Sequence, residues 1–178
     1  WGSAHLPIYA SAKEQVRETF YGGCVWSGLV SQWSDDVKLL DAITTSFTET
    51  ETTSKLSSCI ARVAVFDSSV SEMHGRQELI DFYAGILRLA SELPEVLFIC
   101  KPKNPLPAFI DDSTEDQEQI FADLTSRPNI RVLDYTFDSS VILAITDLSI
   151  SLPFTSTFTE AIGAGKPALY YDPNRSTP

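Results

Sequence analysis

From residue 59 onward, short apolar runs alternate with stretches of helical periodicity, and this alternation constrains the fold more than any other feature. Strands are expected at 60–66, 96–100, 130–134, 148–152 and 167–171. Helices are expected between them at 75–93, 113–126, 138–146 and 157–164. Strands and helices that alternate at this spacing form an open, mostly parallel sheet with helices on both faces. The continuous apolar runs agree, because such strands are buried on both sides. The sequence therefore predicts an α/β, Rossmann-like fold with a sheet of five strands or more.

Residues 1–58 lack this regular alternation of strand and helix patterns. Segments 13–20 and 35–43 favour short helices, whereas ten of the fifteen residues in 44–58 are Ser or Thr. Such a composition is typical of a loop or linker. We therefore expect an irregular or interdomain segment at 1–58 and a Rossmann-like domain at 59–178.

Composition restricts the partners and the compartment. The net charge of −11 opposes nucleic acid or an anionic membrane as the main partner. No apolar run approaches the roughly 20 residues of a transmembrane helix, so we expect no transmembrane segment. The three cysteines, Cys24, Cys59 and Cys100, are scattered and odd in number. This favours a reduced, cytoplasmic setting, with membrane association only through other parts of the protein.

Several common catalytic and cofactor motifs are missing from the sequence. No G-x-G-x-x-G follows the first expected strand, and no G-K-[ST] phosphate loop or G-x-S-x-G elbow occurs. The two histidines, His5 and His74, show no zinc-ligand spacing with the cysteines. We therefore predict neither a metal site nor a bound cofactor.

The candidate site lies where the expected strands end. In open α/β sheets, ligands bind beyond the carboxyl ends of the strands. The loops there carry Asp67, Ser68 and Ser69 after the first strand, Lys101 and Lys103 after the second, and Val132, Leu133, Asp134 and Tyr135 at the end of the third. Asp67 could equally be a ligand contact or a turn residue. The two lysines could equally bind an anion or be solvated residues of a proline-stiffened loop. Two lysines on this edge of an acidic chain nevertheless indicate an anion.

The loop after the fourth strand is the most informative. Thr155, Ser156, Thr157 and Glu160 crowd the start of the expected helix at 157–164. A helix N-terminus carries unpaired N–H groups and partial positive charge, which suits a phosphate. Thr157 and Glu160 also match a capping box, in which each side chain satisfies the other residue's N–H group. Because one hydroxyl suffices for a cap, Thr155 and Ser156 favour a ligand.

These segments resemble a known family. The stretch DLSISLPFTSTFTEAIGAGKPALYYDP at 147–173 resembles the donor-binding half of GT-B glycosyltransferases, in particular bacterial surface-polysaccharide enzymes. There a strand leads into a Pro-x-[ST]-[ST]-x turn, a helix, Gly-Lys-Pro and a strand ending near Tyr-Asp-Pro. Lys-Pro-Lys-Asn-Pro at 101–105 is similar to their Lys-Pro-His-Pro element, with Lys103 in place of His and Asn104 in place of Pro. The resemblance covers about residues 60–173.

The resemblance implies a function and a role for each residue. The chain would be the donor half of an enzyme that transfers a sugar from a CMP-, UDP- or GDP-linked donor to a saccharide acceptor, without a metal. Residues 155–157 would hold the donor phosphate through backbone N–H groups, and Lys101 and Lys103 would offset its charge. Glu160 would lie near sugar or ribose hydroxyls, and the loop 132–135 would hold the base. A second, N-terminal Rossmann-like domain would carry the acceptor site.

Two other functions fit the same residues. A non-catalytic Rossmann-like module would use the hydroxyl cluster only as a helix cap and would bind partners through exposed aromatic residues such as Trp26 and Trp33. A sugar-nucleotide 2-epimerase would share the two-domain architecture and differ in its product.

Overall fold

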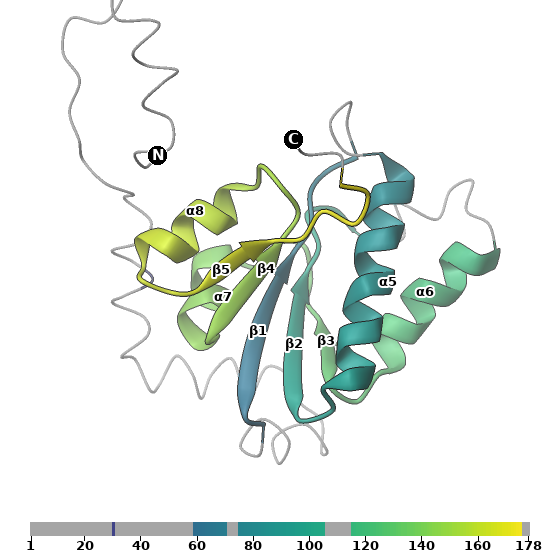
Figure 1. Cartoon of the computed structure of the whole chain (residues 1–178), viewed down its shortest axis with the longest axis horizontal. Coiled ribbons are helices and arrows are strands. Elements are labelled where there is room, and N and C mark those ends of the chain that lie inside the picture. Colours follow the sequence, from purple (N-terminus) through teal and green to yellow (C-terminus); the bar gives the residue numbers. More distant parts are fainter. Residues whose placement is uncertain (1–29, 31–58, 71–74, 106–114, 176–178) are drawn as a thin grey trace, which may run out of the picture.

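The computed structural model describes residues 30, 59–70, 75–105 and 115–175. The helices expected at 13–20 and 35–43 and the linker expected at 44–58 lie outside the described residues. The strands are β1 (Ala61–Phe66), β2 (Val96–Lys101), β3 (Ile130–Val132), β4 (Leu148–Ser151) and β5 (Ala168–Tyr170). The helices between them are α5 (Arg76–Glu92), α6 (Glu115–Ser126), α7 (Ser139–Ile145) and α8 (Ser156–Gly163) (Figure 1). Each expected strand and helix of this part is present.

The five strands form one sheet in the order β3-β2-β1-β4-β5, and every pairing is parallel. The α/β, Rossmann-like fold predicted from the sequence is thereby confirmed. Because all strands point the same way, their carboxyl ends share one edge of the sheet, called here the carboxyl edge, and their starts share the opposite, amino edge. β1 lies at the centre, so the loop after it faces the loops after both β2 and β4.

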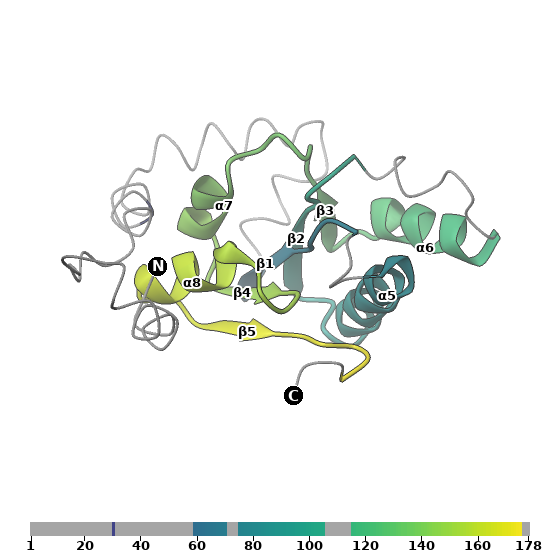
Figure 2. The same cartoon turned by 90° about the horizontal axis from the view of Figure 1, so that it is seen from above.

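Helices cover both faces of the sheet (Figures 1 and 2). Val63 and Val65 of β1 pack with buried residues of α5 and α6, such as Phe82. The alternate β1 residues, including Phe66, pack with α7 and α8 on the other face. Val30 is fully buried in that second cluster. The alternation along β1 follows from the period of two in a strand, which sends successive side chains to opposite faces.

The chain after β5 returns across the molecule to α5 (Figure 1). Tyr171 lies 5.7 Å from Phe82, measured between ring centroids. A Cβ atom at Gly85 would clash with the Tyr171 ring and its hydroxyl oxygen. The helix can therefore accept this ring at close range only because residue 85 has no side chain.

Candidate functional site

A cavity of about 220 Å³ lies at the carboxyl edge. Its lining comes from the ends of β1 and β2, the loops after β1, β2 and β4, and the first residues of α7 and α8. The lining residues are Phe66, Asp67, Ser68, Ser69, Lys101, Lys103, Ser139, Phe154, Thr155, Ser156 and Thr157. Eight of these residues were candidates from the sequence. The fold brings them together because β1, β2 and β4 are neighbours in the sheet.

Hydroxyl groups hold the turn between β4 and α8. The Thr155 hydroxyl donates to the Leu152 carbonyl oxygen at 3.0 Å. The Thr157 hydroxyl donates to the Thr155 hydroxyl at 3.2 Å and lies 3.3 Å from the Ser151 hydroxyl. Two of the three predicted phosphate-binding hydroxyls thus stabilise the turn, whereas Ser156 is exposed to solvent. The first-turn N–H groups of α8 point to this end of the helix, as they do in every α-helix.

The capping box expected between Thr157 and Glu160 is wrong. The helix begins at Ser156, with Thr155 as its N-cap, and the Thr155 side chain makes no capping hydrogen bond. The Thr155 hydroxyl donates to the Leu152 carbonyl oxygen instead. Because the helix begins at Ser156, Thr157 lies inside the first turn and is not the N-cap.

Glu160 lies one turn into α8 and is half-buried. Burial raises the pKa of its carboxyl group, a hydrogen bond with Ser156 lowers it, and Asp138, Lys101 and Lys103 all lie close enough to influence it. Glu160 therefore lies close to the cavity without lining it.

The two lysines come from the end of β2. Lys101 is half-buried and Lys103 is exposed. Burial and the neighbouring Lys103 both lower the pKa of Lys101, while Asp67, Asp138 and Asp134 raise it. The pKa of Lys101 is thus set by burial, by one neighbouring ammonium group and by three carboxyl groups around the cavity.

Asp67 anchors the loop after β2 that carries Lys103. It is 5% exposed at the end of β1, where the buried Tyr83 hydroxyl of α5 donates to Oδ2 at 2.8 Å. The Lys103 backbone N–H donates to Oδ1. Burial raises the pKa of Asp67 to about 6, although both hydrogen bonds favour its ionised form. Asp67 thus joins β1, α5 and the lysine loop, a structural role beyond either interpretation from the sequence.

Tyr83 was not among the residues singled out from the sequence. It belongs to the apolar face of α5, with the Phe121 ring 6.0 Å away, so the helical pattern marks it as a core residue. Burial also raises its own pKa well above the usual value. Only the fold reveals that its hydroxyl reaches the site.

The predicted base-binding loop lies on the same edge but outside the cavity lining. Val132 is half-buried, and Leu133 is 8% exposed in the core beneath α7. The Asp134 carboxylate accepts hydrogen bonds from the Thr136 backbone N–H and hydroxyl, whereas Tyr135 is 43% exposed. Among these four residues, Tyr135 has the large exposed side chain that a ligand could contact.

Phe154 also lines the cavity and was not among the candidates from the sequence. It has φ = 63°, in the left-handed region, and is 65% exposed. A left-handed aromatic residue has no signature in the sequence, because Gly and Asn are the usual residues at such positions.

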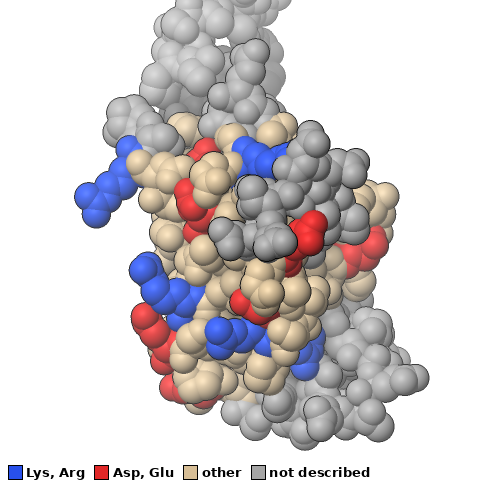
Figure 3. All heavy atoms as spheres, turned by 90° about the vertical axis from the view of Figure 1, so that its right-hand side faces the viewer, with Lys and Arg blue, Asp and Glu red and all other residues tan. Residues whose placement is uncertain are grey.

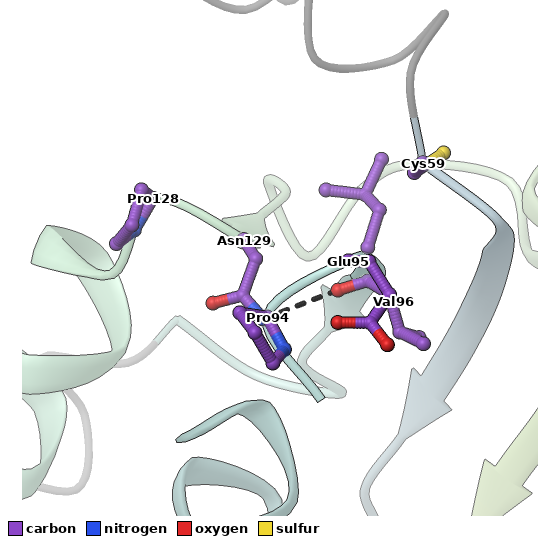
Figure 4. A pocket seen from close by; sticks show the side chains of 7 residues that line it. Cys59, Pro94, Glu95, Val96, Pro128 and Asn129 are labelled. Atoms are coloured by element: carbon purple, nitrogen blue, oxygen red, sulfur yellow. Dashed lines mark hydrogen bonds between the residues drawn. The ribbon is translucent and has the colours of Figure 1, made fainter. Parts of the chain in front are cut away.

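The amino edge holds a larger cavity of about 400 Å³ (Figure 4). Its lining comprises Cys59, Pro94, Glu95, Val96, Leu97, Pro128 and Asn129. The Asn129 side-chain amide donates to the carbonyl oxygens of Ala90, Leu93 and Val96 at 2.9–3.1 Å. Asn129 therefore ties the end of α5 to the start of β2.

The face built by α5 and α6 shows acidic and basic side chains interspersed (Figure 3). Such a mixture creates no field of one sign. Within the described ranges, no group of three or more His, Cys, Asp or Glu side chains is arranged to hold a metal ion. Nor does that part of the chain contain a helix long and apolar enough to cross a membrane.

Solved structures share this fold. A UDP-GlcNAc 2-epimerase from Neisseria meningitidis, bound to UDP-GlcNAc, matches 92% of this chain with a TM-score of 0.59 and 16% identity. A UDP-forming α,α-trehalose-phosphate synthase from Burkholderia xenovorans matches 82% with a TM-score of 0.51 and 9% identity. The chain covers 42% and 34% of these two proteins. A search of curated protein sequences found no match.

A protein-family comparison identifies the chain over its whole length. The family model described as "Polysaccharide biosynthesis PFTS motif protein" matches residues 1–178. The letters P-F-T-S occur once in this sequence, at Pro153–Ser156, in the turn that lines the cavity. The chain therefore belongs to the family of polysaccharide biosynthesis PFTS motif proteins.

Proposed function

We propose that this chain is the donor-binding half of a GT-B glycosyltransferase that uses a nucleotide-sugar in polysaccharide or glycoconjugate synthesis. The observation that carries the proposal is the cavity at the carboxyl edge, where Lys101, Lys103 and the start of α8 converge. Family membership in polysaccharide biosynthesis supports it. So does the fold shared with one enzyme bound to UDP-GlcNAc and another that forms UDP.

In this proposal, the donor phosphates lie between the lysines and the first turn of α8. The backbone N–H groups of Ser156 and Thr157 bind the phosphate oxygens, together with the exposed Ser156 hydroxyl. Thr155 and Thr157 act through their hydroxyls on the shape of the turn, in keeping with their hydrogen bonds. Fixed positive groups of this kind stabilise the charge that develops on a departing nucleotide, so the site needs no metal ion for this purpose.

The other predicted residues take places around the phosphates. Glu160 accepts hydrogen bonds from sugar or ribose hydroxyls, and Ser68 and Ser69 line the cavity opposite α8. The base rests against the loop 132–135, with Tyr135 as its exposed contact. β3 and β4 are three strand spacings apart, or about 14 Å, which an extended nucleotide can bridge.

The rest of the enzyme completes the proposal. A second Rossmann-like domain binds the saccharide acceptor, in keeping with the chain covering less than half of each of the two solved structures. The three scattered cysteines, an odd number, favour a reducing, cytoplasmic compartment.

Titration of the chain with UDP, GDP and CMP, followed by amide NMR, tests the proposal. We expect one nucleotide to shift the amide signals of Ser156, Thr157 and Lys101, and Ser156→Ala to weaken its binding. Leu169→Ala, an exposed substitution outside the cavity, serves as the control. The absence of binding by all three nucleotides at millimolar concentration would overturn the proposal.

A further inference from the structure

Phe154 occupies an unfavourable conformation without the compensation of burial. Its φ of 63° lies in the left-handed region, which costs free energy for a residue with a Cβ atom. Its ring is 65% exposed, so core packing does not offset that cost. Strained backbone of this kind persists where the surrounding structure holds it, and it clusters at ligand sites. Phe154 also lines the cavity.

Contacts on both sides of Phe154 hold the turn in place. The Thr155 hydroxyl donates to the Leu152 carbonyl oxygen, across Phe154, at 3.0 Å. The Tyr170 hydroxyl, on the edge strand β5, donates to the Thr155 carbonyl oxygen at 3.4 Å. The Tyr170 ring in turn stacks on Phe158 of α8, with ring centroids 3.9 Å apart and planes 19° from parallel. These contacts hold the backbone on both sides of Phe154 and so keep the residue at the cavity.

The position of Phe154 identifies the part of the ligand that it meets. An aromatic ring cannot hydrogen-bond a phosphate, and the neighbouring N–H groups and lysines serve that purpose. The loop 132–135 lies at the end of β3, and the turn with Phe154 follows β4. In the sheet, β2 and β1 lie between these two strands. A ligand with its base there and its phosphates at α8 brings its sugar to the side of Phe154.

We propose that Phe154 is the platform on which the sugar ring of the nucleotide-sugar stacks, so that the site prefers the sugar conjugate to the free nucleotide. The inference rests on the proposed function and adds a sugar-binding residue to it. The negative face of an aromatic ring attracts the partly positive C–H groups on one face of a pyranose. Aromatic walls with a few polar groups are the usual construction of small-molecule sites.

The experiment compares the affinities of three pairs of probes: UDP and UDP-GlcNAc, GDP and GDP-mannose, and CMP and CMP-sialic acid. Calorimetry on the full 178-residue chain measures each dissociation constant for the wild type and for Phe154→Trp, Phe154→Leu and Phe154→Gly. Glycine accepts φ = 63° without strain, so Phe154→Gly removes the ring while preserving the turn. Ile162→Ala, which removes exposed apolar surface elsewhere on α8, is the matched control.

The expected result separates the sugar from the nucleotide. For the pair that binds, the wild type and Phe154→Trp prefer the conjugate, as does Ile162→Ala. Phe154→Leu and Phe154→Gly lose about 3- to 10-fold of that preference, the range measured for aromatic contacts, while their affinity for the free nucleotide changes less than twofold. Thermal unfolding at or above the wild-type temperature shows that Phe154→Gly is folded.

Three outcomes overturn the inference. The first is a wild type that binds nucleotide without preferring any conjugate. The second is a preference that survives in Phe154→Leu and Phe154→Gly, and the third is an equal loss of affinity for nucleotide and conjugate, which assigns Phe154 to the shape of the turn. In all three, nucleotide still binds to the wild type, so the proposed function stands. A wild type that binds none of the six probes refutes both the inference and the proposed function.

Discussion

The two edges of the sheet both carry a cavity, and the cavities differ in what their polar groups do. At the amino edge, in about 400 Å³, the Asn129 amide is directed to backbone carbonyl oxygens of its own chain (Figure 4). At the carboxyl edge, in about 220 Å³, Lys101, Lys103 and Ser156 lie around the space instead. The polar amide at the larger cavity thus stabilises the fold. The smaller cavity combines fold-stabilising groups, such as Asp67 and Thr155, with the lysines that the proposed function assigns to the ligand. Cavity volume alone would select a different edge from the one to which the proposed function assigns the nucleotide.

The lysines of the two edges show the same contrast. Lys166 precedes β5, and its ammonium group donates to the carbonyl oxygens of Ala144 and Thr146 at 3.0 and 2.6 Å. It thereby satisfies carbonyl groups at the end of α7, where a positive charge is favourable. Lys101 and Lys103 instead lie beside each other at the cavity. The Lys of Gly-Lys-Pro is therefore structural, whereas those of Lys-Pro-Lys are available to an anion.

Removal of both cavity lysines should have the largest effect on function. We expect Lys101→Ala with Lys103→Ala to weaken the binding of the preferred nucleotide about 100-fold or more, since each charge-assisted contact is worth about 1.5–3 kcal/mol. Calorimetry measures the affinity. Arg127→Ala, which removes a positive charge at the amino edge, should leave it unchanged. An equal loss in Arg127→Ala would mean that overall charge, rather than the cavity, attracts the nucleotide.

Asp67 should make the stability of the domain depend on pH. Its pKa is about 6 in the folded chain and 3.8 in the unfolded chain, so between these values the folded state binds more protons. Its contribution is fully present below pH 3.8 and is lost as pH rises through 6, by about 3 kcal/mol in total.

Asp67→Asn tests this dependence, because the amide keeps one acceptor and cannot ionise. Urea unfolding of both proteins between pH 4 and 7 measures it. The wild type should lose about 2.5 kcal/mol relative to Asp67→Asn over this range, which is most of the total. Parallel stability curves for the two proteins would contradict the assignment of the titration to Asp67.

Lys166→Met should lower stability and leave nucleotide binding intact. The substitution keeps the aliphatic length but removes the two hydrogen bonds that the ammonium group donates at the end of α7, which costs about 2 kcal/mol. Chemical denaturation gives the stability, and calorimetry below the unfolding transition gives the affinity. A loss of affinity without a loss of stability would place Lys166 among the ligand-binding residues.

The smallest effect is expected for Asn129→Ala at the amino edge. Its amide has three carbonyl acceptors, but the adjoining cavity lets water replace part of these bonds, so we expect a loss of about 1 kcal/mol of stability. Nucleotide affinity should equal that of the wild type. If Asn129→Ala abolished binding while the chain remained folded, the contrast between the two edges would fail.

Local pattern predicted the elements well and the details of the site less well. The five strands and four helices lie where apolar runs and helical spacing place them, because those patterns follow directly from burial. The carboxyl-edge rule then brought Asp67, Lys101 and Thr155 to one place correctly. The capping box between Thr157 and Glu160 failed because the helix begins at Ser156, so Thr157 lies in the first turn and is not the N-cap. Thr155 is the N-cap, but its hydroxyl donates to the Leu152 carbonyl oxygen rather than accepting from the helix.

The sequence by itself determined the alternation of strands and helices, the hydroxyl-rich turn and the placement of the two lysines after a strand. These features are encoded in residues close together in the chain. Only the tertiary structure decided that Tyr83 supports Asp67, that Asp67 holds the lysine loop, and that Phe154 stands exposed at the cavity in a left-handed conformation. The physical reason is that a buried hydrogen bond across 16 residues, or the contact of an edge strand with a turn, depends on how the elements pack.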